Sequence, residues 1–146
     1  MNLDFESAEL SPIPSGQFGG SVSITNALPG WTGSISASQV TQVLQNNLTL
    51  GLPSIDILGP NWSFGAIIEG QYTLVLQPGG SATYSSASIS QTGFVPSGTR
   101  SLQFKAQTYS AFSVSLGGQA LSLTPLGTGG NYTLYGADVS SFAGQI

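Results

Sequence analysis

The strongest constraint on the fold is the alternation of apolar and polar residues between residues 101 and 106. Leu102, Phe104 and Ala106 fall on one side of an extended chain, and the polar residues between them fall on the other. A period of two residues is typical of a β-strand with one buried face. A second strand-like run, residues 88–94, precedes the Val-Pro-Ser-Gly-Thr connection. We therefore expect strands, not helices, to organise the chain.

Similar short runs recur along the chain and are separated by Gly and Pro. We expect strands at residues 2–10, 21–25, 31–35, 41–45, 55–58, 66–68, 71–77, 112–116, 121–123 and 132–135. Gly117-Gly118 is typical of the two-residue connection of a β-hairpin. Helix competes with strand in residues 36–50, where β-branched residues favour the strand. Residues 138–144 predict one helical turn with Asp138 as its N-cap.

This pattern predicts an all-β fold, an antiparallel β-sandwich with jelly-roll connections. The length of 146 residues fits a single domain, residues 1–146, and no linker divides it. We find no internal repeat of fixed period, which disfavours a solenoid or a propeller.

Charged residues make up only 5% of the chain, and Arg100 and Lys105 are its two cations. Binding to nucleic acid requires several Lys or Arg side chains, so DNA and RNA are excluded as partners. Anionic membranes are disfavoured for the same reason. No apolar stretch reaches the ~18 residues that a spanning helix needs, so we expect no membrane insertion. Abundant Ser, Thr, Gly and Asn with scarce Lys and Glu favour an exported bacterial protein at the cell surface.

The composition also excludes several kinds of chemistry. The absence of Cys and His excludes disulfides, thiolate sites and Ser-His-Asp catalysis. A glycosidase needs two carboxyl groups across a cleft, and Asp56 and Glu69 are the mid-chain acids that could meet. No motif supports that pair, so we expect a protein that is not an enzyme and carries no cofactor.

A carbohydrate-binding surface is better supported than an active site. Aromatic faces stack on the C–H surfaces of sugars, and neutral amides bind their hydroxyl groups. Trp62 is the first stacking candidate, followed by Tyr84 and Tyr109, and the amides of Asn61 and Gln107 could donate or accept. Each aromatic also has a purely structural interpretation, because large aromatic side chains are usually buried. We expect Trp31, which lies outside this set, to fill the core.

Several segments in a fixed order carry a resemblance to a known family. They are NLDFE (2–6), LPGW (28–31), EGQYTLVLQ (69–77), SQTGFVPSGTRSLQF (90–104), VSLGGQALSLTPL (114–126) and YTLYGADVSSFAGQ (132–145). In this order they resemble the galactose-binding-like jelly roll of many carbohydrate-binding modules. More narrowly, they resemble bacterial exported proteins that carry a PEP-CTERM sorting tail.

The resemblance implies two further features. Such jelly rolls often hold a structural Ca²⁺ near the first strand, and Glu6 matches that position; the alternative is that Glu6 is a solvated charge. Family members also continue past the segment that matches residues 142–145. Either this chain is truncated before the final strands and the sorting tail, or its fold closes differently. A missing strand would leave an open sheet edge, which favours self-association.

Two functional hypotheses follow. The first is a non-enzymatic surface module that binds a glycan or a cell-surface polysaccharide. The alternative is a structural subunit of an extracellular matrix or fibre that associates by strand pairing.

Overall fold

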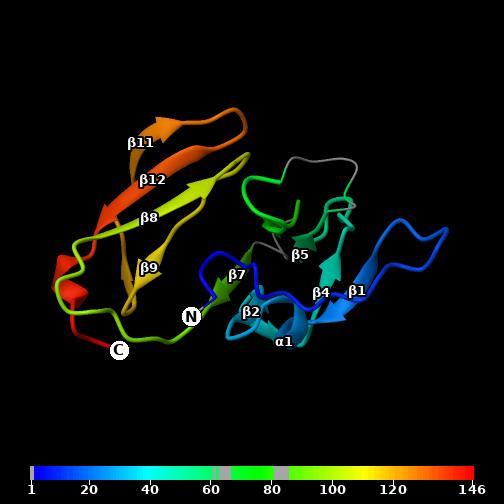
Figure 1. Ribbon diagram of the computed structural model, residues 1–146, viewed down its shortest axis with the longest axis horizontal. Helices are drawn as coiled ribbons and strands as arrows, with labels where there is room; N and C mark the ends of the chain where they lie inside the picture. The colour runs from blue at the N-terminus through cyan, green and yellow to red at the C-terminus, as the bar shows by residue number, and fades with distance from the viewer. Residues whose placement is uncertain (1, 61, 63–66, 81–85) are drawn as a thin grey trace. The chain divides into compact units, whose positions relative to one another are not determined.

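The computed structural model describes residues 2–60, 62, 67–80 and 86–146 (Figure 1). They form two compact units, residues 1–91 and 92–146, which are described separately below. Strands dominate both units, which confirms the all-β prediction. The helical elements among the described residues are one turn of α-helix and one turn of 3₁₀ helix. The single domain expected from length stays a prediction.

Unit 1 contains two sheets. The first has the strand order β1-β4-β5-β6, formed by β1 (Gly20–Ser23), β4 (Gln42–Gln45), β5 (Ser54–Leu58) and β6 (Thr73–Gln77). The second has the order β3-β2-β7, formed by β2 (Thr32–Ile35), β3 (Ser38–Val40) and β7 (Ala87–Ser90). The short helix α1 (Ile24–Ala27) follows β1 directly. Strand β4 confirms the choice of strand over helix near residues 41–45.

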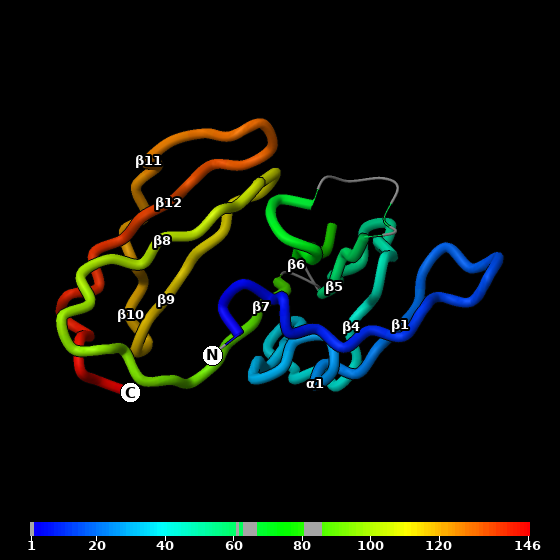
Figure 2. The backbone as a smooth tube through the Cα atoms, in the orientation of Figure 1, coloured from blue at the N-terminus to red at the C-terminus, as the bar shows by residue number. Residues whose placement is uncertain are grey.

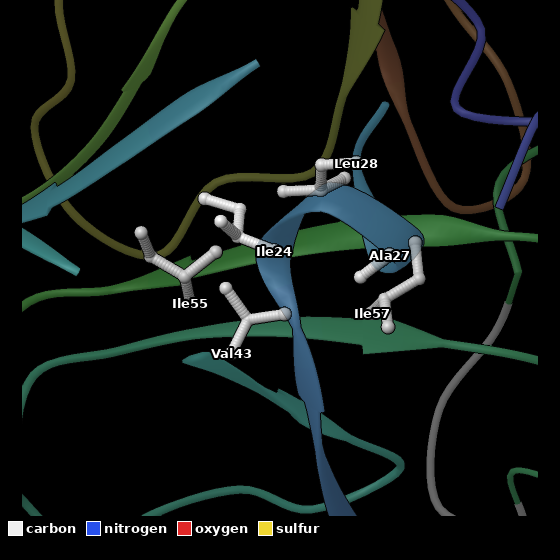
Figure 3. Packing of buried hydrophobic residues seen from close by; sticks show 6 residues of the cluster. All are labelled: Ile24, Ala27, Leu28, Val43, Ile55 and Ile57. Atoms are coloured by element: carbon white, nitrogen blue, oxygen red, sulfur yellow. The ribbon is translucent and has the colours of Figure 1, made fainter. Parts of the chain in front are cut away.

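The two sheets of unit 1 share a small apolar core, and Figure 3 shows its buried members. Its buried members come from α1 and the residue after it, from β4 and from β5: Ile24, Ala27, Leu28, Val43, Ile55 and Ile57. Partly buried side chains of the second sheet pack against them: Ile35, Val40, Ala87 and Ile89. Unit 1 is therefore a small β-sandwich. Its jelly-roll strand order stays a prediction.

Gly33 lets the two sheets approach closely. A Cβ atom at this position would lie 2.7 Å from Cδ1 of Ile24 and 2.8 Å from Cδ1 of Ile55. Gly33 lies on β2 and Ile55 on β5, so the missing side chain leaves room for the core between the sheets.

Unit 2 is built on an antiparallel three-stranded sheet of order β11-β12-β8 (Figure 2). Its strands are β8 (Ser101–Ala106), β11 (Thr124–Thr128) and β12 (Thr133–Asp138). Strand β8 spans the residues predicted from the alternation. A hairpin of β9 (Ser115–Leu116) and β10 (Gln119–Ala120) turns at Gly117-Gly118, as predicted, with φ values of 56° and 77°. The 3₁₀ helix η1 (Ser140–Phe142) follows β12.

An aromatic cluster forms on one face of this sheet. Phe104 on β8 and Tyr135 on β12 are cross-strand partners, and their ring centroids lie 5.6 Å apart in a stacked arrangement. The ring of Phe112 meets both edge-on, at 6.2 Å from Phe104 and 5.3 Å from Tyr135. The segment that joins β8 to β9 is thereby fixed to the sheet.

The predicted strand at residues 2–10 is wrong. The carboxylate of Asp4 accepts a hydrogen bond from the backbone N–H of Glu6, and Phe5 has a φ of 65°. This local turn competes with extended backbone, as short polar side chains commonly do. Phe5 still reaches the core, where its ring lies 5.6 Å from that of Trp31. Trp31 packs against the core as expected, and its Nε1 donates to the backbone oxygen of Asn2.

We predict that Gly33→Ala lowers the free energy of unfolding of the chain by about 1–2 kcal/mol, because the added methyl overpacks the core. Gly20→Ala is the control, since a Cβ at Gly20 meets nothing within 4 Å. Combining Gly33→Ala with Ile55→Val, which removes the crowding Cδ1, should recover part of the loss. Urea unfolding of the four proteins measures this. Equal effects of both glycine substitutions would contradict the packing described.

Candidate functional site

The candidate site of unit 1 lies where β4 and β5 run parallel, with Leu44 opposite Asp56. Parallel neighbours cannot be joined by a tight hairpin, so residues 46–53 cross from the end of β4 to the start of β5. We call residues 46–53 the crossover segment. Ile55 and Ile57 face the core, so Asp56, between them, lies on the opposite face of the sheet.

Hydrogen bonds at both ends hold the crossover segment. Asn46 has a φ of 48°, its backbone N–H donates to the oxygen of Ile57, and its Oδ1 accepts from the N–H of Gly59 at 2.7 Å. Left-handed backbone is tolerated better by Asn than by most residues, which fits Asn to this turn. Farther along, Nε2 of Gln77 on β6 donates to the backbone oxygen of Thr49 at 2.7 Å.

Asp56 is completely buried, with 0% of its surface exposed. Its Oδ2 accepts a hydrogen bond from the backbone N–H of Asn47 at 3.0 Å. Its Oδ1 is buried and has no hydrogen-bond partner among the described residues. Burial raises the pKa of this carboxyl to about 7, although the backbone N–H groups of Asn47 and Asn46 oppose the shift. Asp56 therefore exchanges its proton near neutral pH.

A hollow of about 190 Å³ opens beside this region. Its lining combines hydroxyl and amide side chains with the apolar edge of the core: Ser21, Ile35, Gln42, Val43, Leu44, Thr49, Pro53, Ser54 and Ile55. The hydroxyl of Ser54 is buried and, like Oδ1 of Asp56, has no hydrogen-bond partner within the described part of the chain. Two polar atoms on the same face of β5 thus lack partners.

Glu6 fastens the N-terminal segment to the turn before β6. Its two carboxylate oxygens accept hydrogen bonds from the backbone N–H of Gln71, at 3.0 and 3.1 Å, and one also accepts from the N–H of Tyr72 at 3.1 Å. Gly70, with a φ of 69°, leaves the space that the carboxylate fills. Glu6 is therefore a structural clip whose oxygens already have donors.

Calcium ligation by Glu6 stays a prediction. Ca²⁺ takes six to eight oxygen ligands, several of them usually carboxylates. Across residues 2–60, 62, 67–80 and 86–146, no group of three or more His, Cys, Asp or Glu side chains comes together as a metal site.

In unit 2, two of the predicted binding residues lie on the segment that follows β8. Gln107 and Tyr109 are both exposed, and Tyr109 has 88% of its surface accessible. Phe112, three residues after Tyr109, is anchored on Phe104 and Tyr135. The anchored ring holds the end of this segment while the Tyr109 ring stays open to solvent.

A second hollow, of about 420 Å³, lies at the other end of β8. It is lined by Gly98, Thr99, Arg100, Asp138, Ser140 and Ala143. Oδ1 of Asp138 accepts from the backbone N–H of Ser140 at 2.8 Å, but the N-cap of η1 is Val139, so the prediction of Asp138 as the N-cap is wrong by one residue. Hydrogen bonds from the backbone and side chain of Ser140 lower the pKa of Asp138.

Of the other predicted binding residues, one belongs to unit 1 and two lie outside the described residues. Trp62 is half-buried and belongs to unit 1, where its backbone N–H donates to the oxygen of Gly59. Asn61 and Tyr84 lie outside the described residues. The acids weighed as a catalytic pair differ sharply in environment, because Asp56 is buried and Glu69 is exposed.

Sequence reasoning missed the special position of Asp56. A signal was available, because an acidic residue stands in the middle of the apolar run Ser54–Leu58. All five residues of this strand are buried, since β5 is an inner strand of the first sheet.

The chain matches no protein-family model, no curated protein and no solved structure. Over the described residues, no helix has the length and apolarity needed to cross a bilayer.

We predict that Glu6→Gln lowers the free energy of unfolding by about 1–2 kcal/mol, because the amide keeps one acceptor oxygen and turns an N–H₂ toward backbone donors. The exposed residue Glu9, substituted as Glu9→Gln, is the matched control. Denaturant unfolding at pH 7 measures both. A loss no larger than that of the control would show that the clip contributes nothing to stability.

Proposed function

We propose that the chain is a non-enzymatic module of an exported bacterial surface protein and binds a neutral polysaccharide through residues 107–112. The observation that carries this proposal is the exposure of Tyr109, 88% accessible, on a segment whose far end is anchored. An exposed aromatic ring on a fixed segment is a suitable platform for the C–H face of a sugar ring.

The side chains near Tyr109 in the sequence, and the few charges of the chain, favour a neutral ligand. Gln107, also exposed, provides an amide that can donate to and accept from sugar hydroxyl groups. The whole chain has only two cations and six acids, so an ionic ligand would find few opposite charges. Phe112 is itself partly accessible beside the Phe104–Tyr135 stack and extends the aromatic surface.

Export and cell-surface location are supported by composition, with few charges and many hydroxyl and amide side chains. The resemblance to galactose-binding-like modules and to PEP-CTERM-sorted proteins agrees with this location. It also favours a glycan as the ligand over a small metabolite.

Strand pairing between chains is the second candidate function, and the sheet of unit 2 favours it. Within this sheet β8 pairs on one side only, with β12. At the opposite edge, β11 carries Pro125 and an irregularity between Pro125 and Gly127. Proline and bulges obstruct the addition of another strand. The edge of β8, six residues long, is therefore the more open of the two.

We predict that Tyr109→Ala weakens polysaccharide binding about tenfold, the equivalent of about 1.4 kcal/mol for one lost stacking contact. Phe18→Ala is the control, because Phe18 is an exposed aromatic residue of the other unit, 91% accessible. A glycan array identifies the ligand, and affinity gels containing that polysaccharide compare the variants.

Binding that survives Tyr109→Ala would reject the proposed surface, and the absence of binding to every polysaccharide would reject the proposed function. Light scattering after size-exclusion chromatography tests the second candidate. A strict monomer at high protein concentration would count against strand pairing.

A further inference from the structure

We propose that the carboxyl group of Asp56 is a proton-operated latch on the crossover segment, residues 46–53. The protonated carboxyl holds the segment closed on the sheet, and ionisation opens it to water. This inference concerns unit 1 and does not depend on the proposed glycan-binding surface of unit 2.

Backbone hydrogen bonds join the buried carboxyl group to the start of a surface segment. Asp56 is wholly enclosed, yet its Oδ2 binds the backbone N–H of Asn47, the second residue of the crossover segment. The other oxygen, Oδ1, has no hydrogen-bond partner among the described residues. The backbone N–H groups of Asn47 and Asn46 favour the carboxylate, but the loss of hydration outweighs them, so the buried site favours the protonated carboxyl.

Among the causes of the pKa shift of Asp56, which concern the described residues, there is no charged group that would compensate for ionisation. The strand neighbours at its position are Leu44 on β4 and Val75 on β6, which are both apolar. The ionisable side chains on the segments packed beside β5 include Tyr72, which lies against Gly59 just beyond β5, and Glu6, whose carboxylate binds the backbone of residues 71 and 72. Neither of them is a cation.

The hydrogen bonds that reach Asp56 within the described part of the chain come from the backbone N–H groups of Asn47 and Asn46, which are neutral.

Among the elements around Asp56, the crossover segment is the one that opens at least cost. Its three leucines, Leu48, Leu50 and Leu52, are all exposed, so displacement of the segment loses little apolar burial. Its remaining attachments include hydrogen bonds from Gln77 to Thr49 and from the N–H of Gly80 to the oxygen of Gly51. Segments that bury few apolar side chains open locally before the rest of a domain unfolds.

The sign of the pH dependence follows from linkage. In the closed form the pKa of Asp56 is about 7, and in an open, hydrated form it returns toward 3.8. Between these two values the closed form holds the proton more tightly, so raising the pH favours opening. The ratio of open to closed molecules then rises about tenfold per pH unit from about pH 4 to pH 7, and is constant above pH 7.

Amide hydrogen exchange of the whole chain, followed by NMR, tests the latch. The reporters are the amides of Asn46, Asn47 and Gly80, and the amide of Ile57 in β5 reports on larger opening. After division by the chemical exchange rate at each pH, we expect the reporters to lose protection steadily from pH 4 to pH 7 and then level off. Ile57 should stay better protected than the reporters throughout.

Asp56→Asn should abolish this pH dependence, because the amide does not ionise. Asp138→Asn is the matched control: Asp138 also accepts a backbone N–H, but it is exposed and its pKa is lowered, so the reporters should behave as in the wild type. The proposal would be overturned if the protection of the reporter amides did not depend on pH. It would also be overturned if the reporters of Asp56→Asn lost protection with rising pH as they do in the wild type. A third contradicting result would be that the reporter amides and the Ile57 amide lose protection to the same extent at every pH.

Where Asp56→Asn does not fold, the ¹³Cγ resonance of Asp56 in the wild type provides the decisive titration. An inflection near pH 7 shared by the Asn47 amide supports the latch. An inflection below pH 5 overturns it.

Discussion

Hydrogen bonds from side chains to the backbone hold the connections between the strands of unit 1. Glu6 binds the turn before β6, Gln45 donates to the oxygen of Ser11, and Asn46 and Gln77 fasten the two ends of the crossover segment. With only 5% charged residues, the chain has little capacity for ion pairs. Apolar contacts bring the sheets together, while amides and single carboxylates fix the segments between strands.

Two aspartates show how the same contact has opposite consequences in different surroundings. Asp56 and Asp138 each accept a backbone N–H two or more residues away, at 3.0 and 2.8 Å. At the exposed Asp138 the hydrogen bonds dominate and the pKa falls, whereas at Asp56 the loss of hydration dominates and the pKa rises. A pKa near neutral pH is therefore a consequence of the burial of the carboxyl group and not of its hydrogen bond.

Local sequence patterns predicted the elements that depend only on neighbouring residues. The alternation at residues 101–106 and the Gly117-Gly118 turn need no distant partner, and both are found in the structure. Tyr109 could also be placed at the surface from its Ser-rich neighbours. The burial of Asp56 could not be predicted, because it follows from β5 lying between β4 and β6, which is a property of strand order. The expected strand at residues 2–10 failed because Asp4 binds the backbone nearby. A hydrogen bond between a side chain and the nearby backbone does not change the alternation of apolar and polar residues, so the alternation did not reveal this turn.

The unequal edges of the sheet in unit 2 limit the kind of assembly that it can support. A filament built from repeated strand addition needs two receptive edges per subunit, one for each neighbour. Pro125 and the adjoining irregularity obstruct β11, so β8 is the less obstructed edge of this sheet. Two copies that paired through β8 would be related by a twofold axis, and each would occupy the β8 edge of the other. Only the obstructed β11 edges of this sheet would then remain unpaired. Association through this sheet would therefore stop at a dimer.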